Sequence, residues 1–102
     1  YHLPHGAACA MTLDVFIRYN ADATGERGVR LARAAGFSDM QALAEAVSQL
    51  KQAVGLPRRL SEVGVRDDDL DSLVDASFHP LMNNNPRPVT PQALRGLYES
   101  IL

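Results

Sequence analysis

The sequence predicts an all-α fold, a compact bundle of about five helices in a single domain spanning residues 1–102. Three observations support this prediction. The 102 residues include 46% hydrophobic and 22% charged side chains, a composition typical of one globular domain. Apolar residues recur at helical spacings in several segments, and no segment is a credible strand. Capping residues, glycines and prolines separate these segments.

The first expected helix lies within residues 6–19, where the sequence GAACAMTLDVFIRY carries only one charge, Asp14, before Arg18. Its alanine, methionine and leucine residues favour a helix over a strand. A helix that is apolar on all faces must be covered on all faces, so we expect a buried central helix. Cys9 lies in this segment, and we expect it to be a small apolar core residue rather than a nucleophile.

Two further helices are expected between a polar break at residues 20–24 and Gly55. Thr24 is the predicted N-cap of a short helix that ends at Gly36, and Ser38 is the predicted N-cap of the next helix. Gly55 then supplies the left-handed residue after that helix. The apolar stripe of the longer helix consists of Leu43, Val47, Leu50 and Val54.

Two more helices are expected in the second half of the chain. Asp67 is the predicted N-cap of the fourth helix, and Thr90 caps the last helix with Pro91 at its first position. The linker between the third and fourth helices has apolar anchors at Leu56, Leu60, Val63 and Val65. The two buried stripes are Leu70, Leu73, Val74 and Phe78, and then Leu94, Leu97, Tyr98 and Ile101.

Two clusters of charged residues each allow a purely structural interpretation and a ligand-binding one. Arg27, Arg30 and Arg33 recur every three residues, as a solvated helix face or as a phosphate-binding patch. The aspartates at 67–71 mark a helix start or, less simply, a metal site. The calcium-loop pattern needs a central glycine and a distant glutamate, which are absent, so the helix start is favoured.

The histidines near residue 1 form the first candidate site. His2 and His5 are separated by two residues, but Pro4 restricts Leu3 to extended geometry, so a shared helical face is not expected. We expect His5 at the last loop residue or in the first turn of the first helix. A neutral imidazole there can bind a divalent first-row metal, although His5 judged alone is better explained as an ordinary surface histidine.

The segment HPLMNNNPRPV, residues 79–89, forms the second candidate and is expected to be an irregular loop. Its polar residues could line a cleft with amide donors and a guanidinium, or they could form a surface turn, and the two interpretations stay open. These residues are Asn83, Asn84, Asn85, Pro86 and Arg87.

Taken together, these motifs resemble the iron-containing, metal-dependent group III alcohol dehydrogenases. Residues 1–10, YHLPHGAACA, resemble the "PHG" segment of that family, and residues 15–20, VFIRYN, resemble the end of its following helix. Residues 55–64 are similar to its linker, and residues 85–87 are similar to its C-terminal "NPR" signature. The four landmarks follow the family's order over essentially the whole chain.

The resemblance implies a two-domain enzyme with a dehydroquinate synthase-like fold, in which residues 1–102 would be the later part of the C-terminal helical domain. An N-terminal nucleotide-binding domain would be its partner, with the active site in the cleft between them. The family's metal is held by one aspartate and three histidines, and His5 matches the last of these histidines. Asn85 and Arg87 would help to shape the cleft without a catalytic role. Leu81 stands where some relatives carry a cysteine.

The implied activity is the interconversion of an alcohol and an aldehyde or ketone by hydride transfer. Fe2+ or Zn2+ would act as a Lewis acid, and NAD or NADP would carry the hydride. Within residues 1–102 the resemblance assigns a metal-binding role to His5 and a catalytic role to no residue. The isolated chain is expected to be inactive and to expose an apolar patch that promotes self-association. The parent enzyme is expected to bind a small alcohol or aldehyde and to form a homo-oligomer.

The alternative is a free-standing helical interaction domain or a DNA-binding domain. The arginine face favours it slightly, but a net charge of −2 opposes nucleic-acid binding. A single cysteine excludes an internal disulfide framework. No apolar run approaches the roughly 18 residues that would span a bilayer, so we expect no membrane partner and a cytoplasmic location.

Overall fold

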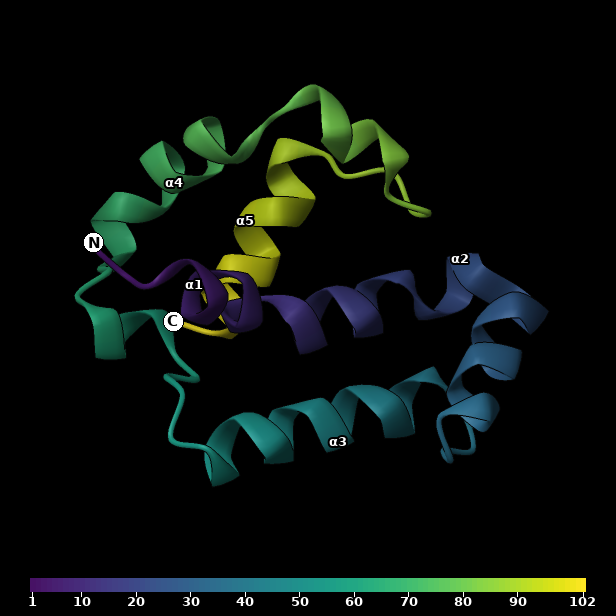
Figure 1. Ribbon diagram of the computed structural model, residues 1–102. Coiled ribbons are helices and arrows are strands. Elements are labelled where there is room, and N and C mark those ends of the chain that lie inside the picture. The colour runs from purple at the N-terminus through teal and green to yellow at the C-terminus, as the bar shows by residue number, and fades with distance from the viewer.

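The computed structural model describes residues 1–102 and confirms the all-α class, with five α-helices, three short 3-10 helices and no strand (Figure 1). The α-helices are α1 (His5–Met11), α2 (Leu13–Ala34), α3 (Met40–Ala53), α4 (Leu70–Ser77) and α5 (Pro91–Ser100). The 3-10 helices are η1 (Leu60–Val63), η2 (Asp67–Asp69) and η3 (Pro80–Asn84). None of the helices is long and apolar enough to cross a membrane.

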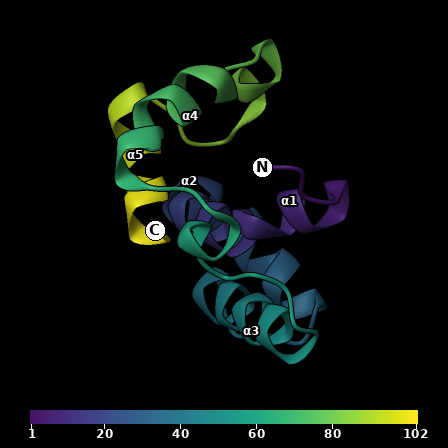
Figure 2. The same ribbon diagram turned by 90° about the vertical axis from the view of Figure 1, so that its left-hand side faces the viewer.

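Helix α2 runs through the middle of the molecule. Helix α3 returns antiparallel along one side of it, whereas α4 and α5 pack on each other on the opposite side (Figures 1 and 2). The α2–α3 pair and the α4–α5 pair therefore form two halves of the molecule, and the first part of the chain contacts both of them. The molecule measures 38 × 31 × 20 Å along its principal axes.

The segment predicted as one buried helix is divided and is only partly covered. It bends at Thr12 (φ −107°, ψ 0°), where α1 ends and α2 begins. Met11, Asp14 and Val15 are buried, but Leu13 is 49% exposed. The prediction of burial on all faces is therefore wrong within residues 1–102, because α3 and the core cover only part of the helix surface.

Helix α2 continues through the predicted polar break and kinks one residue later, at Gly25. This glycine has φ +51° and ψ −134°, a conformation that only glycine adopts readily. Thr24 is not an N-cap, because its hydroxyl donates to the carbonyl of Ala21 within the helix at 2.9 Å. Alanines between the polar residues are strong helix formers, which explains why the helix persists over residues 20–24.

Helix α3 begins and faces differently from the prediction. Its N-cap is Asp39 rather than Ser38, since the carboxylate of Asp39 accepts a hydrogen bond from the Ala42 N–H at 2.8 Å. The residues buried on this helix are Met40, Ala44 and Lys51. The predicted stripe is only partly covered, and Leu50 and Val54 are both 62% exposed. At the C-terminal end Gly55 adopts the expected left-handed conformation, with φ +77°.

The second half of the chain follows the predicted caps in part. Thr90 caps α5 by accepting from the Ala93 N–H at 3.1 Å, as predicted. Asp67 does not cap α4, because the three aspartates form the 3-10 helix η2, in which Asp69 accepts from the Arg66 N–H at 2.9 Å. The loop expected to be irregular contains the short helix η3.

The main core lies between α1, the η1 linker, α4 and α5. Its fully buried members are Leu70 of α4 and Leu94 of α5, so the stripes predicted for these helices face inward, except that Phe78 at the end of the α4 stripe is 40% exposed. The backbone N–H of Leu60 donates to the carbonyl of Ile101 at 2.7 Å, which ties the linker to the end of α5. The buried core residues are Met11, Leu60, Val65, Leu70, Val74, Leu94 and Tyr98.

The exposed side chains on α3 lead to a prediction about association. Large exposed apolar side chains favour contacts between molecules. We expect the 102-residue chain to self-associate as its concentration rises, and Leu50→Lys to reduce that association. The comparison variant Ala53→Lys adds the same charge at another exposed position of α3 without removing a large apolar group. Sedimentation velocity over a concentration series measures the effect, and a monomer at all concentrations would contradict the expectation.

Candidate functional site

The candidate metal ligand His5 is the first residue of α1, within the range expected from the sequence. Helix α1 turns its half-buried and buried side, which carries Ala7, Ala10 and Met11, toward the rest of the molecule. His5 and Cys9 are exposed and lie one turn apart, with 3.4 Å between the imidazole Nε2 and the thiol Sγ. The prediction that Cys9 is a core residue is wrong, because this cysteine is on the uncovered side of a two-turn helix.

Within residues 1–102, His5 can supply one ligand to a metal ion. The imidazole is exposed; its hydrogen-bond partner is the Cys9 thiol, and it donates to no carboxylate. Nowhere do three or more histidine, cysteine, aspartate or glutamate side chains gather closely enough to hold a metal. His2 precedes α1 and His79 precedes η3, where its Nδ1 accepts from the Leu81 N–H. A complete metal centre therefore needs ligands in addition to these 102 residues.

The asparagine-rich loop contacts the middle of α2. The side chains of Asn85 and Asn20 exchange two hydrogen bonds, each of 2.8 Å, from one carboxamide to the other. Asn85 also donates to the carbonyl of Arg87 at 2.6 Å, which fixes the turn. No hydrogen bond or ion pair joins this loop to His5, so the structure does not unite the two candidate sites.

Arg87 and its neighbour strengthen the same contact. The guanidinium of Arg87 lies 4.2 Å from the centre of the Tyr19 ring, a cation–π arrangement. The hydroxyl of Tyr19 donates to the carbonyl of Pro88 at 2.5 Å. Asn83 and Asn84 are exposed. The structure therefore supports neither of the two open interpretations for Asn85 and Arg87. Their polar groups form the contacts that hold the loop on α2, so they neither form a bare surface turn nor line a ligand cleft.

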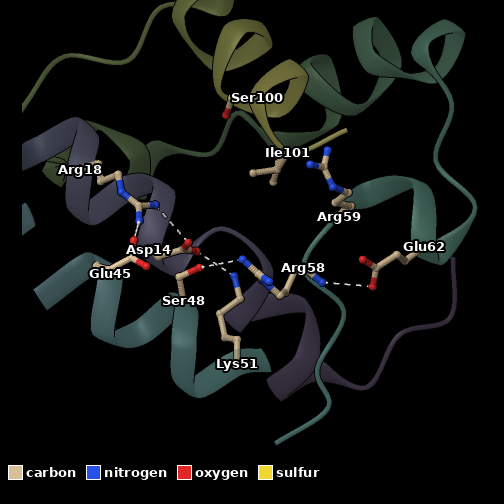
Figure 3. A pocket seen from close by; sticks show the side chains of 10 residues that line it. All are labelled: Asp14, Arg18, Glu45, Ser48, Lys51, Arg58, Arg59, Glu62, Ser100 and Ile101. Carbon is tan, nitrogen blue, oxygen red and sulfur yellow. Dashed lines mark hydrogen bonds and ion pairs between the residues drawn. The ribbon is translucent and has the colours of Figure 1, made fainter. Parts of the chain in front are cut away.

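The strongest polar feature escaped sequence analysis. Lys51 of α3 is only 5% exposed, and its Nζ lies 2.7 Å from Asp14 Oδ1 and 3.1 Å from the carbonyl oxygen of Met11 (Figure 3). Arg18 completes the cluster, with one nitrogen 3.2 Å from Asp14 and the other 3.1 Å from Glu45. The lone charge at Asp14 in an apolar segment was the only signal in the sequence, and a lysine ordinarily indicates an exposed position.

The electrostatics of Asp14 follow from these contacts. Burial by itself would raise the pKa of the Asp14 carboxyl, but the hydrogen bond and positive charge of Lys51, with a smaller contribution from Arg18, outweigh burial. The pKa of Asp14 therefore lies below its usual value. A carboxyl with a lowered pKa in the folded state stabilises the fold above its unfolded-state pKa. This stabilisation is lost as the pH falls through the folded-state pKa.

Removing the Asp14 charge should therefore destabilise the chain. We expect Asp14→Asn to lower the free energy of unfolding by about 3–5 kcal/mol at neutral pH, because Lys51 would stay buried without a counter-charge. The loss should shrink in acid, where the wild-type carboxyl is itself protonated. Adding Lys51→Met to Asp14→Asn should recover part of the stability. Urea unfolding at several pH values tests this, and an unchanged midpoint in Asp14→Asn would contradict it.

The loop contact can be tested with neighbouring asparagines. We expect Asn85→Ala to lower the free energy of unfolding by about 1–3 kcal/mol, because Asn20 loses both of its hydrogen bonds to the Asn85 carboxamide. Asn84→Ala removes the same chemical group one residue earlier, at an exposed position, and should change stability by less than about 0.5 kcal/mol. Thermal or urea unfolding followed by circular dichroism provides the comparison. Equal effects of the two substitutions would show that the paired carboxamides do not hold the loop.

Comparison with solved structures finds the same arrangement in an enzyme. A sulfoacetaldehyde reductase from Bifidobacterium kashiwanohense, solved in complex with NAD+, superposes with a TM-score of 0.89 and 37% sequence identity. The likeness covers 97% of this chain and 26% of that chain. It supports the helical architecture described above as a recurring one.

Comparisons of sequence agree. The chain is 37% identical to lactaldehyde reductase of Escherichia coli over 98% of its own length and 28% of that protein. It is 33% identical to a 1-propanol dehydrogenase of Salmonella typhimurium, over 100% of its own length and 32% of that protein. The chain thus spans about a third or less of the length of these relatives. The family description "Fe-containing alcohol dehydrogenase family, C-terminal" matches residues 1–102, so the chain belongs to the Fe-containing alcohol dehydrogenase family and corresponds to its C-terminal helical region.

Proposed function

We propose that residues 1–102 serve as the C-terminal helical part of a metal-dependent, NAD(P)-linked alcohol dehydrogenase. The reaction would interconvert an alcohol and an aldehyde or ketone by hydride transfer. The family match over the entire chain is the observation that carries this proposal. The names of the lactaldehyde and sulfoacetaldehyde reductases favour a small aldehyde as the substrate class.

His5 is the residue of this chain that we assign to the metal. Its exposed imidazole stands at the start of α1, where it can meet ligands from another part of the polypeptide. Neutral imidazole suits iron and zinc, so the residue fits either ion. Bound Fe2+ or Zn2+ would supply Lewis-acid chemistry at the substrate oxygen. The contribution of this chain is to hold the imidazole in place through α1.

The exposed apolar side chains of α3 suggest how the chain meets its partner. Leu50 and Val54 lie one turn apart, and a nucleotide-binding domain of the same polypeptide would remove such a surface from water. NAD is favoured as cofactor by the reductase solved with NAD+, whereas an NADPH-dependent butanol dehydrogenase is 23% identical over 99% of the chain. Both cofactors therefore belong in the assay. We further propose a homo-oligomeric, cytoplasmic enzyme.

The decisive experiment uses the full-length gene product that carries this chain. We expect it to purify with a divalent metal and to oxidise NADH or NADPH in the presence of small aldehydes. His5→Ala should lower metal affinity by at least about 10–100-fold, because loss of even an outer-shell partner has an effect of that size. The control is His2→Asn, since His2 has φ +55°, which asparagine tolerates. Metal content by mass spectrometry and aldehyde-dependent turnover are the two measurements.

Three results would contradict the proposal. The first is a His5→Ala enzyme with wild-type metal content and turnover. The second is a full-length protein that binds no metal and reduces no aldehyde with either cofactor. The third is metal-dependent turnover by the 102-residue chain alone, which carries one candidate ligand and no cluster able to complete a metal site.

A further inference from the structure

A polar hollow of about 360 Å³ opens between α2, α3, the η1 linker and the end of α5 (Figure 3). Its floor is the buried Asp14–Lys51 pair, and Arg58 and Arg59 of the linker border it. Only one hydrophobic side chain, that of Ile101, contributes to its lining. A hollow with so little apolar surface suits a polar ligand rather than a hydrocarbon.

The charges around the hollow do not balance. Four cationic side chains, those of Arg18, Lys51, Arg58 and Arg59, face three carboxylates, those of Asp14, Glu45 and Glu62. Asp14 is engaged by both Lys51 and Arg18, and Glu45 is engaged by Arg18. Glu62 accepts the backbone N–H of Arg58 at 3.3 Å. Arg58 and Arg59, which are adjacent on the linker, are therefore the two cationic side chains without a counter-charge.

Arg58 is fixed by neutral groups. Its guanidinium donates to Gln52 Oε1 at 3.0 Å and to Ser48 Oγ at 3.4 Å, both on α3, and it forms no ion pair. These contacts order the side chain but leave its positive charge unneutralised. An arginine that is already ordered loses less side-chain entropy when it binds a ligand.

Arg59 has no hydrogen-bond or ion-pair partner at its guanidinium. In Figure 3 its side chain lies on the Ile101 side of the hollow, whereas the side chain of Arg58 lies on the Ser48 side. Two guanidinium groups thus flank the opening. Guanidinium presents a planar fork of N–H donors that matches the oxygens of phosphate and carboxylate groups.

We propose that this hollow binds a small phosphate-class oxyanion between Arg58 and Arg59. A tetrahedral oxyanion has oxygens on several sides, so it can accept hydrogen bonds from more than one guanidinium. The net positive charge of the lining attracts it, and Glu62 is the carboxylate that opposes it. The hollow does not include His5, and the proposal goes beyond the dehydrogenase function and does not depend on it.

The test is titration of the 102-residue chain with inorganic phosphate, followed by calorimetry and by NMR of the residue 58–62 amides. We expect saturable binding with shifts confined to the lining of the hollow. Arg59→Gln should weaken binding by about tenfold to a hundredfold, because a charge-assisted pair of hydrogen bonds is lost. This side chain makes no contact that the fold needs, so the variant should stay folded. Glu62→Gln should tighten binding, since it removes the opposing charge.

The control is Arg66→Gln, which removes an exposed guanidinium that lies outside the hollow and makes only a 3.7 Å contact with Asp69. It should leave phosphate binding unchanged, and sulfate should compete with phosphate better than chloride does at equal ionic strength. Failure to saturate, or equal weakening by Arg66→Gln and Arg59→Gln, would overturn the proposal in favour of diffuse attraction to surface charge. Wild-type affinity in a folded Arg59→Gln variant would also overturn it.

Discussion

The arrangement of the first three helices depends on one buried interaction, the contact of Lys51 with Asp14 and Met11. The ammonium group meets a carboxylate at 2.7 Å and the carbonyl of the last residue of α1 at 3.1 Å. It therefore neutralises a buried charge and satisfies a carbonyl at a helix end, where intrahelical partners run out. A well-packed apolar pair could be as stable, but it would not fix the direction of three helices so narrowly.

Other features follow from that contact. With α3 held against the start of α2, Arg18 can reach both Asp14 and Glu45, and the linker after α3 passes over the same cluster. This passage creates the hollow bordered by two arginines. Farther along α2, the paired carboxamides of Asn20 and Asn85 attach the other half of the molecule. A single helix therefore carries a polar contact to each half, while the apolar core lies to one side of it.

Sequence reasoning succeeded where local chemistry decides the outcome. The cap at Thr90 and the left-handed residue Gly55 depend on their neighbours in sequence, and both are confirmed. It failed where two adjacent residues compete for one role, as with Ser38 and Asp39, and where tertiary packing decides burial. An apolar pattern cannot tell which side of a helix is covered, so Leu50 was expected inside, whereas the structure exposes it and buries its neighbour Lys51. His5 was only a weak candidate by itself, since no clustering of ligands marks it, and the resemblance alone assigned a metal-binding role to it.

The position of His5 depends on the same buried lysine. Helix α1 has seven residues and no side-chain cap at its N-terminus, so it is too short to be stable by itself. Burial of Met11 and the bond from Lys51 to the Met11 carbonyl secure its C-terminal end. The imidazole of His5, about two turns before Met11, is then oriented by a helix that α3 holds in place. In a metal-dependent dehydrogenase, the buried Lys51 would thus act as a positioning residue for a ligand that it does not touch.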